Sequence, residues 1–401
     1  MVAEIGSQQT PHSSLLTPHC CYCCYRHRLF KPSEPFITQQ AEVLQRYRPV
    51  YAGWSGEGAP PPAAAVHTLD RISGVALARS SLLRDGRALA RALAPHAPAL
   101  VHAHFGIEGV YALNLARRLG VPLVTTFHGS DATLSRWALL RTGLPSRVNY
   151  LAFRRRLARE GDLFICVSEF IREKVLEIGF PPERTVVHYI GVAVGEKGEG
   201  RGEVGKGRVV LHVARLVEKK GTRYLLEAFA RVARAAPDAR LIIIGDGPLR
   251  EPLEAHARSL GIGERVTFLG AQPHQHVLAA IRSARLVCLP SVTAASGDSE
   301  GLAMVVLEAA ALGRPVVATH HGGIPEAVDD ARTGFLVPER AVPALADRLA
   351  TLLDDDALAH QMGQAARARV LEHFNLVTQG RKLERLFDSV RSKKREVRSE
   401  E

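Results

Sequence analysis

The sequence predicts an α/β protein with two Rossmann-like domains, and three observations support this class. The chain has 401 residues, a length that suggests two domains rather than one. Short apolar runs alternate with helix-length stretches in both halves, a rhythm that is typical of parallel sheets joined by helices. The halves are separated by residues 196–207, which are rich in Gly, Lys and Glu and indicate an interdomain linker.

The expected domain boundaries follow from this pattern. The first domain is expected to span residues 29–195 and the second residues 208–374, with one helix over residues 375–391 after them. The charged residues 392–401 offer little to bury, so we expect this tail to be disordered.

Residues 1–28 form an atypical N-terminal segment. They lack the apolar strand and Gly-rich loop that should open a Rossmann-like domain, so no first strand is recognised there. Cys20, Cys21, Cys23 and Cys24 have overlapping C-x-x-C spacings, but no second pair follows at the distance of a zinc site. We therefore expect no metal on these cysteines, and their use fits a reducing cytoplasm.

Composition and charge narrow the function. No apolar run approaches the roughly 20 residues of a membrane-spanning helix, and no secretory signal opens the chain, so a cytoplasmic location is expected. The net charge of +11 leans toward the N-terminal half. It fits either a solvated basic face or peripheral contact with anionic lipids at the inner face of a membrane. No zinc finger and no interleaved aromatic and basic motif is present, so nucleic acid is not an expected partner.

One apolar stretch contains two carboxylates. Residues 299–315 read S-E-G-L-A-M-V-V-L-E-A-A-A-L-G-R-P, which predicts a buried helix that begins near Gly301. Glu300 and Glu308 are eight residues apart, about 12 Å along a helix. The unpaired N–H groups of the first turn would form an anion site between them. These amides belong to Gly301, Leu302, Ala303 and Met304.

Two interpretations of this carboxylate pair remain open from the residues alone. The pair can offer hydroxyl acceptors at both ends of a ligand whose phosphates sit between them. Alternatively, Glu300 stabilises the helix dipole and Glu308 is partly solvated. A buried carboxylate costs about 2–7 kcal/mol without a polar partner, so Glu308 is expected to have one.

A pair of cations follows the first strand expected in the second domain. The sequence A-R-L-V-E-K-K-G places Arg215 and Lys220 on either side of a turn. Two fixed cations at a strand end can neutralise a diphosphate leaving group as charge develops on it. Lys219 is expected to face solvent, and Lys220, which Gly221 follows, is the preferred candidate of the two.

Two segments of the first domain contain further candidate site residues. T-F-H-G-S-D ends a predicted strand and gives His128 and Gly129, a pattern that suits close backbone approach to a polar ligand. K-P-S-E-P-F-I starts the first helix, with Ser33 as its expected N-cap and Glu34 beside it. His104, at another strand end, is expected to be structural.

Taken in order, these motifs resemble the family-4 retaining glycosyltransferases with the GT-B fold, also called glycosyl transferases group 1. The matching elements are S-E-P-F-I, T-F-H-G-S-D, R-L-x-x-x-K-G, G-D-G-P-L, E-x7-E and G-G-I-P-E. The resemblance implies two Rossmann-like domains that face each other across a cleft, with a C-terminal helix that crosses back to the first domain. Family members usually have an Asp after the G-V near the end of the first domain, and this chain has Ala193 there.

The resemblance also implies an activity. A hexose would pass, with retention, from a nucleotide diphosphate sugar to a saccharide or lipid-linked acceptor, in cell-surface polysaccharide or glycolipid synthesis. No catalytic metal or other cofactor is implied. One alternative is a sugar-nucleotide epimerase of related fold. A further alternative is an impaired member that only binds nucleotide, because the first strand is not recognised.

Roles for the candidate residues come from the same resemblance. Glu300 and His128 would hold the sugar, and Glu308 would hold the ribose. Arg215, Lys220 and the amides of residues 301–304 would stabilise the departing diphosphate. The remaining candidates are Gly129 on the donor side and Ser33 and Glu34 on the acceptor side.

Overall fold

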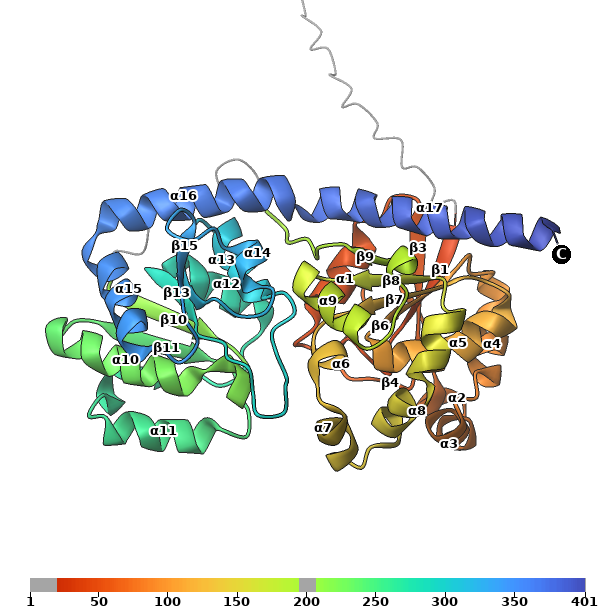
Figure 1. Ribbon diagram of the computed structural model, residues 1–401, viewed down its shortest axis with the longest axis horizontal. Helices are drawn as coiled ribbons and strands as arrows, with labels where there is room; N and C mark the ends of the chain where they lie inside the picture. The colour runs from red at the N-terminus through yellow and green to blue at the C-terminus, as the bar shows by residue number, and fades with distance from the viewer. Residues whose placement is uncertain (1–19, 195–206, 401) are drawn as a thin grey trace, which may run out of the picture.

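The computed structural model describes residues 20–194 and 207–400, which form two α/β lobes side by side (Figure 1). The first sheet has seven strands in the order β5-β3-β1-β6-β7-β8-β9, and the second has six in the order β12-β11-β10-β13-β14-β15. Neighbouring strands in both sheets are parallel. The predicted fold class is confirmed, whereas the predicted linker at 196–207 lies almost wholly outside the described residues.

The first lobe alternates strands with helices. Its sheet contains β1 (Cys20–Tyr25), β3 (Tyr47–Gly53), β5 (Ala65–Thr68), β6 (Val101–His104), β7 (Leu123–Phe127), β8 (Leu163–Cys166) and β9 (Thr185–Val187). The short strands β2 (Arg28–Leu29) and β4 (Ser55–Gly56) pair separately. The helices are α1 (Pro35–Glu42), α2 (Leu69–Ile72), α3 (Gly74–Leu83), α4 (Arg87–Leu93), α5 (Gly106–Leu119), α6 (Ser130–Thr133), α7 (Arg136–Arg141), α8 (Pro145–Glu160) and α9 (Glu169–Glu177).

The second lobe repeats this rhythm. Its strands are β10 (Val209–Val213), β11 (Arg240–Ile244), β12 (Val266–Phe268), β13 (Leu286–Leu289), β14 (Val316–Thr319) and β15 (Gly334–Val337). Its helices are α10 (Thr222–Ala235), α11 (Arg250–Ser259), α12 (His274–Ser283), α13 (Met304–Ala311), α14 (Ile324–Ala327), α15 (Val342–Asp354) and α16 (Asp356–His373). Among these described helices and those of the first lobe, none combines the length and apolarity needed to cross a bilayer.

Both sheets reverse their strand order at the same relative position. In the first sheet, β1 lies between β3 and β6. In the second sheet, β10 lies in the same way between β11 and β13. In such doubly wound sheets, ligands bind outside the carboxyl ends of the strands at this switch point. The loops after β10 and β13 in the second lobe, and after β1 and β6 in the first, are therefore the places to look for a site.

The N-terminal segment corrects the sequence-based expectation, because a first strand is present. β1 pairs with β3 on one side and β6 on the other, so it lies inside the sheet. Tyr22, Cys23, Cys24 and Tyr25 are all buried. Cysteine packs as a small apolar side chain, so C-C-Y-C-C-Y fills the role usually taken by Val and Ile.

The strand geometry also bears on the cysteine pairs. Residues three apart in a strand point to opposite faces of the sheet. Cys23 joins the core cluster on one face with Tyr25, and Cys24 joins the cluster on the other face with Tyr22. The two C-x-x-C spacings therefore do not bring their sulfur atoms together.

The C-terminal helix joins the two lobes. α16 and α17 (Leu376–Glu400) run along the top of both lobes in Figure 1. On the first lobe, Glu384 of α17 accepts the backbone N–H groups of Gln45 and Arg46 at 2.7 and 2.6 Å. Farther along, Lys394 forms a 2.9 Å ion pair with Asp162. The expected disorder of residues 392–401 is therefore wrong as far as residue 400, because tertiary contacts hold the charged end of the helix.

The chain changes direction between α3 and α4. The chain leaves α3 through Arg84, whose φ of 57° is left-handed, and α4 starts at Arg87. The guanidinium of Arg84 lies 3.2 Å from the ring centroid of Phe153 on α8. This break turns the end of α3 toward α8.

Candidate active site

The predicted E-x7-E helix begins later than expected. α13 starts at Met304, and Ala303 is its N-cap with an extended ψ of 93°. Residues 301–303 are not helical because the chain passes close to the first lobe: a Cβ at Gly301 would collide with the carbonyl oxygen of His128. Of the four predicted amides, only that of Met304 lies in the helix, while the other three lie on the approach to it.

Glu300 is paired with a lysine from the neighbouring strand end. Nζ of Lys220 lies 2.6 Å from Oε2 of Glu300, and both side chains are about seven-eighths buried. Burial alone would raise the pKa of Glu300, but the ammonium groups of Lys220 and Lys219 outweigh it and lower the pKa to about 2. The two residues come from the loops after β13 and β10, which meet at the switch point of the second sheet.

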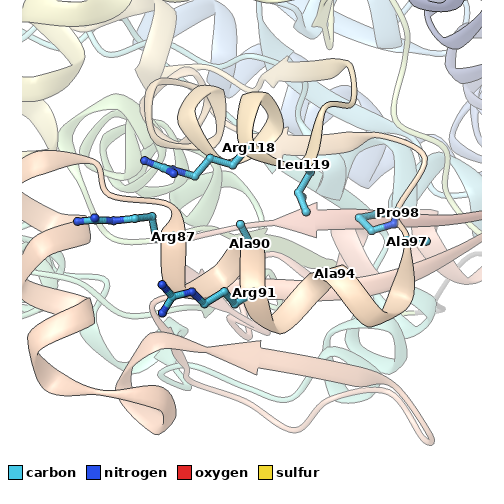
Figure 2. Close-up of a pocket in the computed structure, with 8 residues that line it drawn as sticks. All are labelled: Arg87, Ala90, Arg91, Ala94, Ala97, Pro98, Arg118 and Leu119. Atoms are coloured by element: carbon cyan, nitrogen blue, oxygen red, sulfur yellow. The ribbon is translucent and has the colours of Figure 1, made fainter.

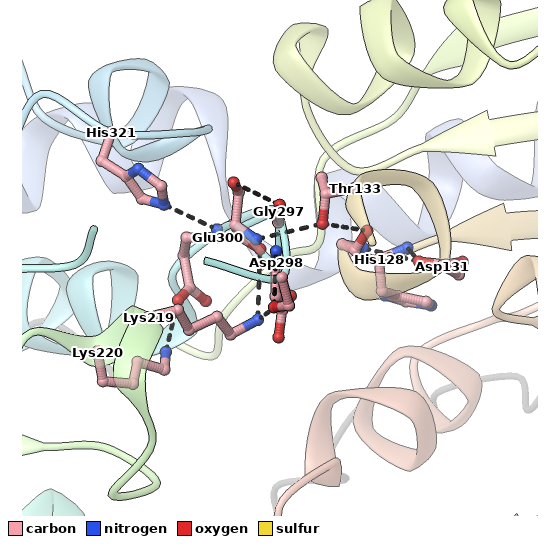
Figure 3. Close-up of polar contacts among 12 residues, drawn as sticks. His128, Asp131, Thr133, Lys219, Lys220, Gly297, Asp298, Glu300 and His321 are labelled. Atoms are coloured by element: carbon pink, nitrogen blue, oxygen red, sulfur yellow. Dashed lines mark hydrogen bonds and ion pairs between the residues drawn. The ribbon is translucent and has the colours of Figure 1, made fainter. Parts of the chain in front are cut away.

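Lys219 corrects another expectation, because its side chain turns inward. Its Nζ lies 3.0 Å from Oδ1 of Asp298 and donates to the carbonyl oxygen of Ser299 at 3.3 Å. Only 16% of the side chain is exposed. Lys219 therefore holds the loop that precedes Glu300 (Figure 3).

A histidine and a second carboxylate support Glu300 from behind. The backbone N–H of Glu300 donates to Nε2 of His321 at 3.0 Å. Because Nε2 accepts, the ring proton lies on Nδ1, which donates to Oε1 of Glu339 at 2.6 Å. Glu339 also accepts the backbone N–H of Thr293 at 2.9 Å. No sequence motif predicted these linked contacts, although the doubled histidine before G-G-I-P-E could have indicated them.

Glu308 has the polar partner that its burial requires. Nε2 of His274, the first residue of α12, lies 2.8 Å from Oε1 of Glu308. The hydrogen bond to Glu308 raises the pKa of His274. Glu308 is thus both paired and partly solvated, with 16% of its side chain exposed.

His128 and Gly129 of the first lobe lie on one loop that is held by a buried carboxyl group. Oδ1 of Asp131 accepts the backbone N–H groups of His128 and Gly129 at 3.2 and 2.9 Å, and Oδ2 accepts that of Gly106 at 2.7 Å. Burial raises the pKa of Asp131 even though these hydrogen bonds lower it. Asp131 stands in the quoted T-F-H-G-S-D motif, yet its role was not predicted.

The imidazole of His128 is neutral. Burial, with the charge of Arg26, holds the pKa of His128 well below its usual value. Nδ1 of His104 lies 3.2 Å from Nε2 of His128, and the two rings stack. His104, which was expected to be structural, is buried and contacts His128.

The two lobes meet at these loops, as Figure 3 shows. The backbone N–H of Ser299 donates to Oγ1 of Thr133 at 3.2 Å, and the N–H of Ser135 donates to the carbonyl oxygen of Ser296 at 3.0 Å. The structure therefore brings the Glu300 loop of the second lobe against the His128–Gly129 loop of the first.

Glu326 forms a further contact between the lobes. Its carboxylate accepts the backbone N–H groups of Glu169 and Phe170 at 2.9 and 3.1 Å, at the start of α9. An acidic side chain at a helix N-terminus stabilises the unpaired amides and the helix dipole. Glu326 thus fixes one lobe on the other.

Arg215 is placed differently from the other candidates. Its side chain is exposed and has no hydrogen-bond or ion-pair partner within residues 20–194 and 207–400. It follows β10 directly, on the same strand end as Lys220, but it is not part of the Lys220–Glu300 pair.

The acceptor-side candidates include one correction. Ser33 is exposed and is not the N-cap of α1; Glu34 occupies that position, without a capping hydrogen bond from its side chain. Instead, Glu34 receives two hydrogen bonds from Arg26, at 3.0 and 2.9 Å. Arg26 also contacts Glu108. Arg26 follows β1 at the switch point of the first sheet, and it was missed because that strand was not recognised.

A cavity of about 590 Å³ lies elsewhere on the first lobe, as Figure 2 shows. Residues of α4, of the turn that follows α4 and of the end of α5 line it, including Arg87, Arg91 and Arg118. None of the candidate site residues borders this cavity, so the site is identified by its chemistry and its position in the sheets.

Comparisons with known proteins agree with this architecture. Residues 195–369 match the family "Glycosyl transferases group 1", and residues 45–196 match "Glycosyltransferase Family 4". The chain is 34% identical over 294 residues to the putative colanic acid biosynthesis glycosyltransferase WcaL of Salmonella typhimurium, covering 72% of this chain and 70% of the relative. It is 33% identical over 301 residues to the GDP-mannose-dependent alpha-(1-6)-phosphatidylinositol monomannoside mannosyltransferase of Mycolicibacterium smegmatis, covering 72% and 76%.

Solved structures share the fold. The crystal structure of Anabaena Alr3699/HepE in complex with UDP-glucose superposes with a TM-score of 0.72 at 21% identity, over 92% of this chain and 100% of that one. Sucrose-phosphate synthase from Thermosynechococcus elongatus gives a TM-score of 0.74 at 20% identity, over 92% and 99%. With two doubly wound lobes, a crossing C-terminal helix and these relatives, the chain belongs to the group 1 family of glycosyltransferases with the GT-B fold.

Proposed function

We propose that this glycosyltransferase transfers a hexose, with retention of configuration, from a nucleotide diphosphate sugar to a saccharide or lipid-linked acceptor. One observation carries the proposal: the 2.6 Å pair of Lys220 with Glu300. The cation that would meet a phosphate lies directly beside the carboxylate that would accept sugar hydroxyl groups. A single donor molecule can therefore touch both.

The diphosphate would be stabilised by groups from the second lobe. Lys220 supplies one charge, and Arg215, exposed and without a partner among the described residues, supplies another. The N–H groups of residues 301–304 have no backbone acceptor within the part of the chain that the structure describes, so they can donate to phosphate oxygens. We propose that this positive charge serves in place of a catalytic metal and that no other cofactor is needed.

The sugar and the nucleoside would be held by the two glutamates. Glu300 stays ionised at neutral pH because its pKa is about 2, so it accepts hydrogen bonds from sugar hydroxyls. Oε1 of Glu308 is occupied by His274, which leaves Oε2 for a ribose hydroxyl. His128, neutral and with Gly129 beside it, would face the sugar from the first lobe.

We take retention from the family resemblance, and a double displacement through a covalent glycosyl-enzyme is not favoured, because no suitable nucleophile stands near His128 in the described chain. Asp131 is the carboxyl group closest in sequence, but its two oxygens accept three backbone N–H groups. We propose that the bond from the anomeric carbon to the phosphate oxygen breaks while the acceptor oxygen bonds on the same face. The acceptor proton passes to the leaving phosphate.

The names of relatives narrow the chemical classes of donor and acceptor that we propose. One solved neighbour binds UDP-glucose, and one relative is GDP-mannose-dependent, so both use nucleotide diphosphate sugars. One relative is named for colanic acid biosynthesis, and the other is a phosphatidylinositol monomannoside mannosyltransferase. We propose a role in polysaccharide or glycolipid synthesis, at the inner face of the membrane, where a lipid-linked acceptor would be reached. Ser33 and Glu34 remain candidates for the acceptor side.

The test is transfer and donor hydrolysis with a panel of labelled nucleotide sugars. Glu300→Ala and Lys220→Ala are expected to reduce turnover at least about 100-fold, because each removes a charge aimed at the donor. Glu183→Ala and Lys174→Ala serve as matched controls on the surface of the first lobe and are expected to keep wild-type rates. Unchanged turnover in both site variants would rule out this site. A product of inverted anomeric configuration would contradict retention.

The structure gives little support to the two alternative functions, a sugar-nucleotide epimerase and an impaired nucleotide-binding member. An epimerase would need a carboxyl group able to gain and lose a proton near neutral pH, and Glu300 is poorly suited because its pKa is about 2. Incubation with donor alone would reveal an epimerised nucleotide sugar if that alternative held. The impaired member was suggested by a missing first strand, and β1 is present.

A further inference from the structure

Exposed apolar side chains gather at one end of the first lobe. Eight of the eleven large apolar residues that are exposed in the described chain lie between residues 72 and 148. Trp137 is 77% exposed, the most of any of them. We name this set the apolar tip, and it consists of Ile72, Val75, Leu82, Leu83, Trp137, Leu140, Leu144 and Val148.

These residues form one surface, because their helices pack together. α3 and α7 both contact α8. The side-chain amide of Asn149 on α8 donates to the carbonyl oxygens of Ser81 and Leu82 at 3.2 and 3.3 Å, which holds the end of α3 beside Val148. In Figure 1, α3, α7 and α8 form the lower edge of the first lobe, on the side away from α17.

α7 has apolar residues on more than one face, so it exposes some of them. Its sequence is R-W-A-L-L-R, and Leu139 is the one residue of the six that is buried. Trp137 and Leu140 are three residues apart and share a face of the helix that Leu139 does not occupy. Arg136 and Arg141 frame that face.

The charge around the apolar tip is mainly positive: Asp70 and Asp85 flank the residues of α2 and α3, but the side formed by α7 and the start of α8 has only basic charged residues. Between Ala132 and Arg159 the sequence has seven arginines and no acidic residue. Arg136, Arg141 and Arg147 have no ion-pair partner in the described parts of the chain. This surface thus combines apolar side chains, a tryptophan and uncompensated arginines.

We propose that the apolar tip docks onto a bilayer that contains anionic lipids. Trp137 and the leucines would enter the interface between headgroups and acyl chains, and the arginines would contact lipid phosphates. A second copy of the chain is a poor occupant, because a two-fold contact would bring the same arginines face to face. Binding needs no sugar transfer; the proposal rests on the proposed function only for its purpose, access to a lipid-linked acceptor.

The charge part of the proposal is tested by co-sedimentation of the full chain with vesicles. Vesicles of equal parts phosphatidylglycerol and phosphatidylcholine are expected to bind the wild type, and pure phosphatidylcholine much less. The triple variant R136Q/R141Q/R147Q is expected to weaken partitioning about fivefold for each arginine. The control R231Q/R234Q/R282Q makes the same charge change on exposed arginines of the second lobe and is expected to bind as the wild type does.

The apolar part is tested with W137S/L140S against the control L371S/V377S, which alters exposed residues of α16 and α17. Only the first pair is expected to lose vesicle binding. Quenching of tryptophan fluorescence by brominated lipids should occur in the wild type and be lost in Trp137→Phe. Thermal unfolding of each variant checks that it is folded, and donor hydrolysis is expected to stay at the wild-type rate.

Three results would overturn the proposal. The wild type could fail to bind either vesicle, or the tip variants could bind as well as it does. Alternatively, analytical ultracentrifugation could show a wild-type dimer that W137S/L140S converts to a monomer, which would make the apolar tip a contact between copies. Failure of sugar transfer by the wild type, with vesicle binding intact, would refute the proposed function and leave the docking surface standing.

Discussion

Two buried carboxyl groups at the boundary between the lobes are compensated in opposite ways. Asp131 of the first lobe receives only backbone N–H groups, and burial raises its pKa. Glu300 of the second lobe is buried as well, but two lysines lower its pKa to about 2. Hydrogen bonds from neutral amides are weaker than the attraction of a nearby ammonium group, so similar burial gives opposite shifts.

The two lobes also differ in the charge of the other residues at their boundary. The first lobe presents His128 and His104, both neutral because burial lowers their pKa. The second lobe presents ion pairs and an exposed cation. In the proposed reaction, the cations of the second lobe would meet the donor diphosphate, while Glu300 and the neutral His128 would meet the sugar from opposite lobes.

The largest expected effect tests whether Asp131 serves the fold. Asp131→Ala leaves three backbone N–H groups without their acceptor, and each buried unsatisfied donor costs about 1–3 kcal/mol. After local relaxation, we expect the free energy of unfolding to fall by about 2–4 kcal/mol. Urea denaturation measures it, with Asp238→Ala as the exposed control. Equal stability of the two variants would mean that the loop does not depend on Asp131.

The next prediction concerns the titration of the two groups. In a ¹³C NMR titration, the Glu300 carboxyl is expected to have its midpoint near pH 2, while that of Asp131 lies above 3.8. Because the folded pKa of Glu300 is depressed, its stabilising contribution is complete above about 4.5 and is lost as the pH falls toward 2. For Asp131 the sign is reversed, because protonation favours the folded state.

A lysine variant sharpens this comparison. Lys220→Met should move the Glu300 midpoint upward and leave that of Asp131 unchanged. The signal of the exposed Glu183, on the surface of the first lobe, provides the internal reference. If Glu300 and Asp131 titrated together in the wild type, the contrast drawn between the lobes would not hold.

Sequence patterns predicted those parts of the molecule that depend on local periodicity. Most strands and helices, the two lobes and the cations after β10 were predicted. β1 was missed because its buried residues are Cys and Tyr instead of Val and Ile, although cysteine packs as an apolar residue. β1 was therefore missed because its amino-acid composition is unusual for a strand, although its place in the fold is ordinary.

The remaining misses depend on contacts between distant segments. The helix start at Met304 is set by the approach of Gly301 to His128 of the other lobe, which no local pattern records. The end of α17 is held by Asp162, 232 residues away in sequence. Asp131 and His321 act on backbone N–H groups, so their partners have no characteristic residue type. Only tertiary structure identifies such residues.

The smallest expected effect concerns His321, which contacts Glu300 through its backbone and is a positioning residue. His321→Ala removes the acceptor of the Glu300 N–H and is expected to lower kcat about tenfold, with little change in KM, because a slightly displaced carboxylate still binds the donor. His321→Gln can place an oxygen near the position of Nε2, so it should recover part of the loss. The neighbouring exposed His320→Ala is the control. Equal activity of His321→Ala and His320→Ala would mean that the second lobe holds Glu300 through Lys220 alone, as a charge pair without the support of the backbone.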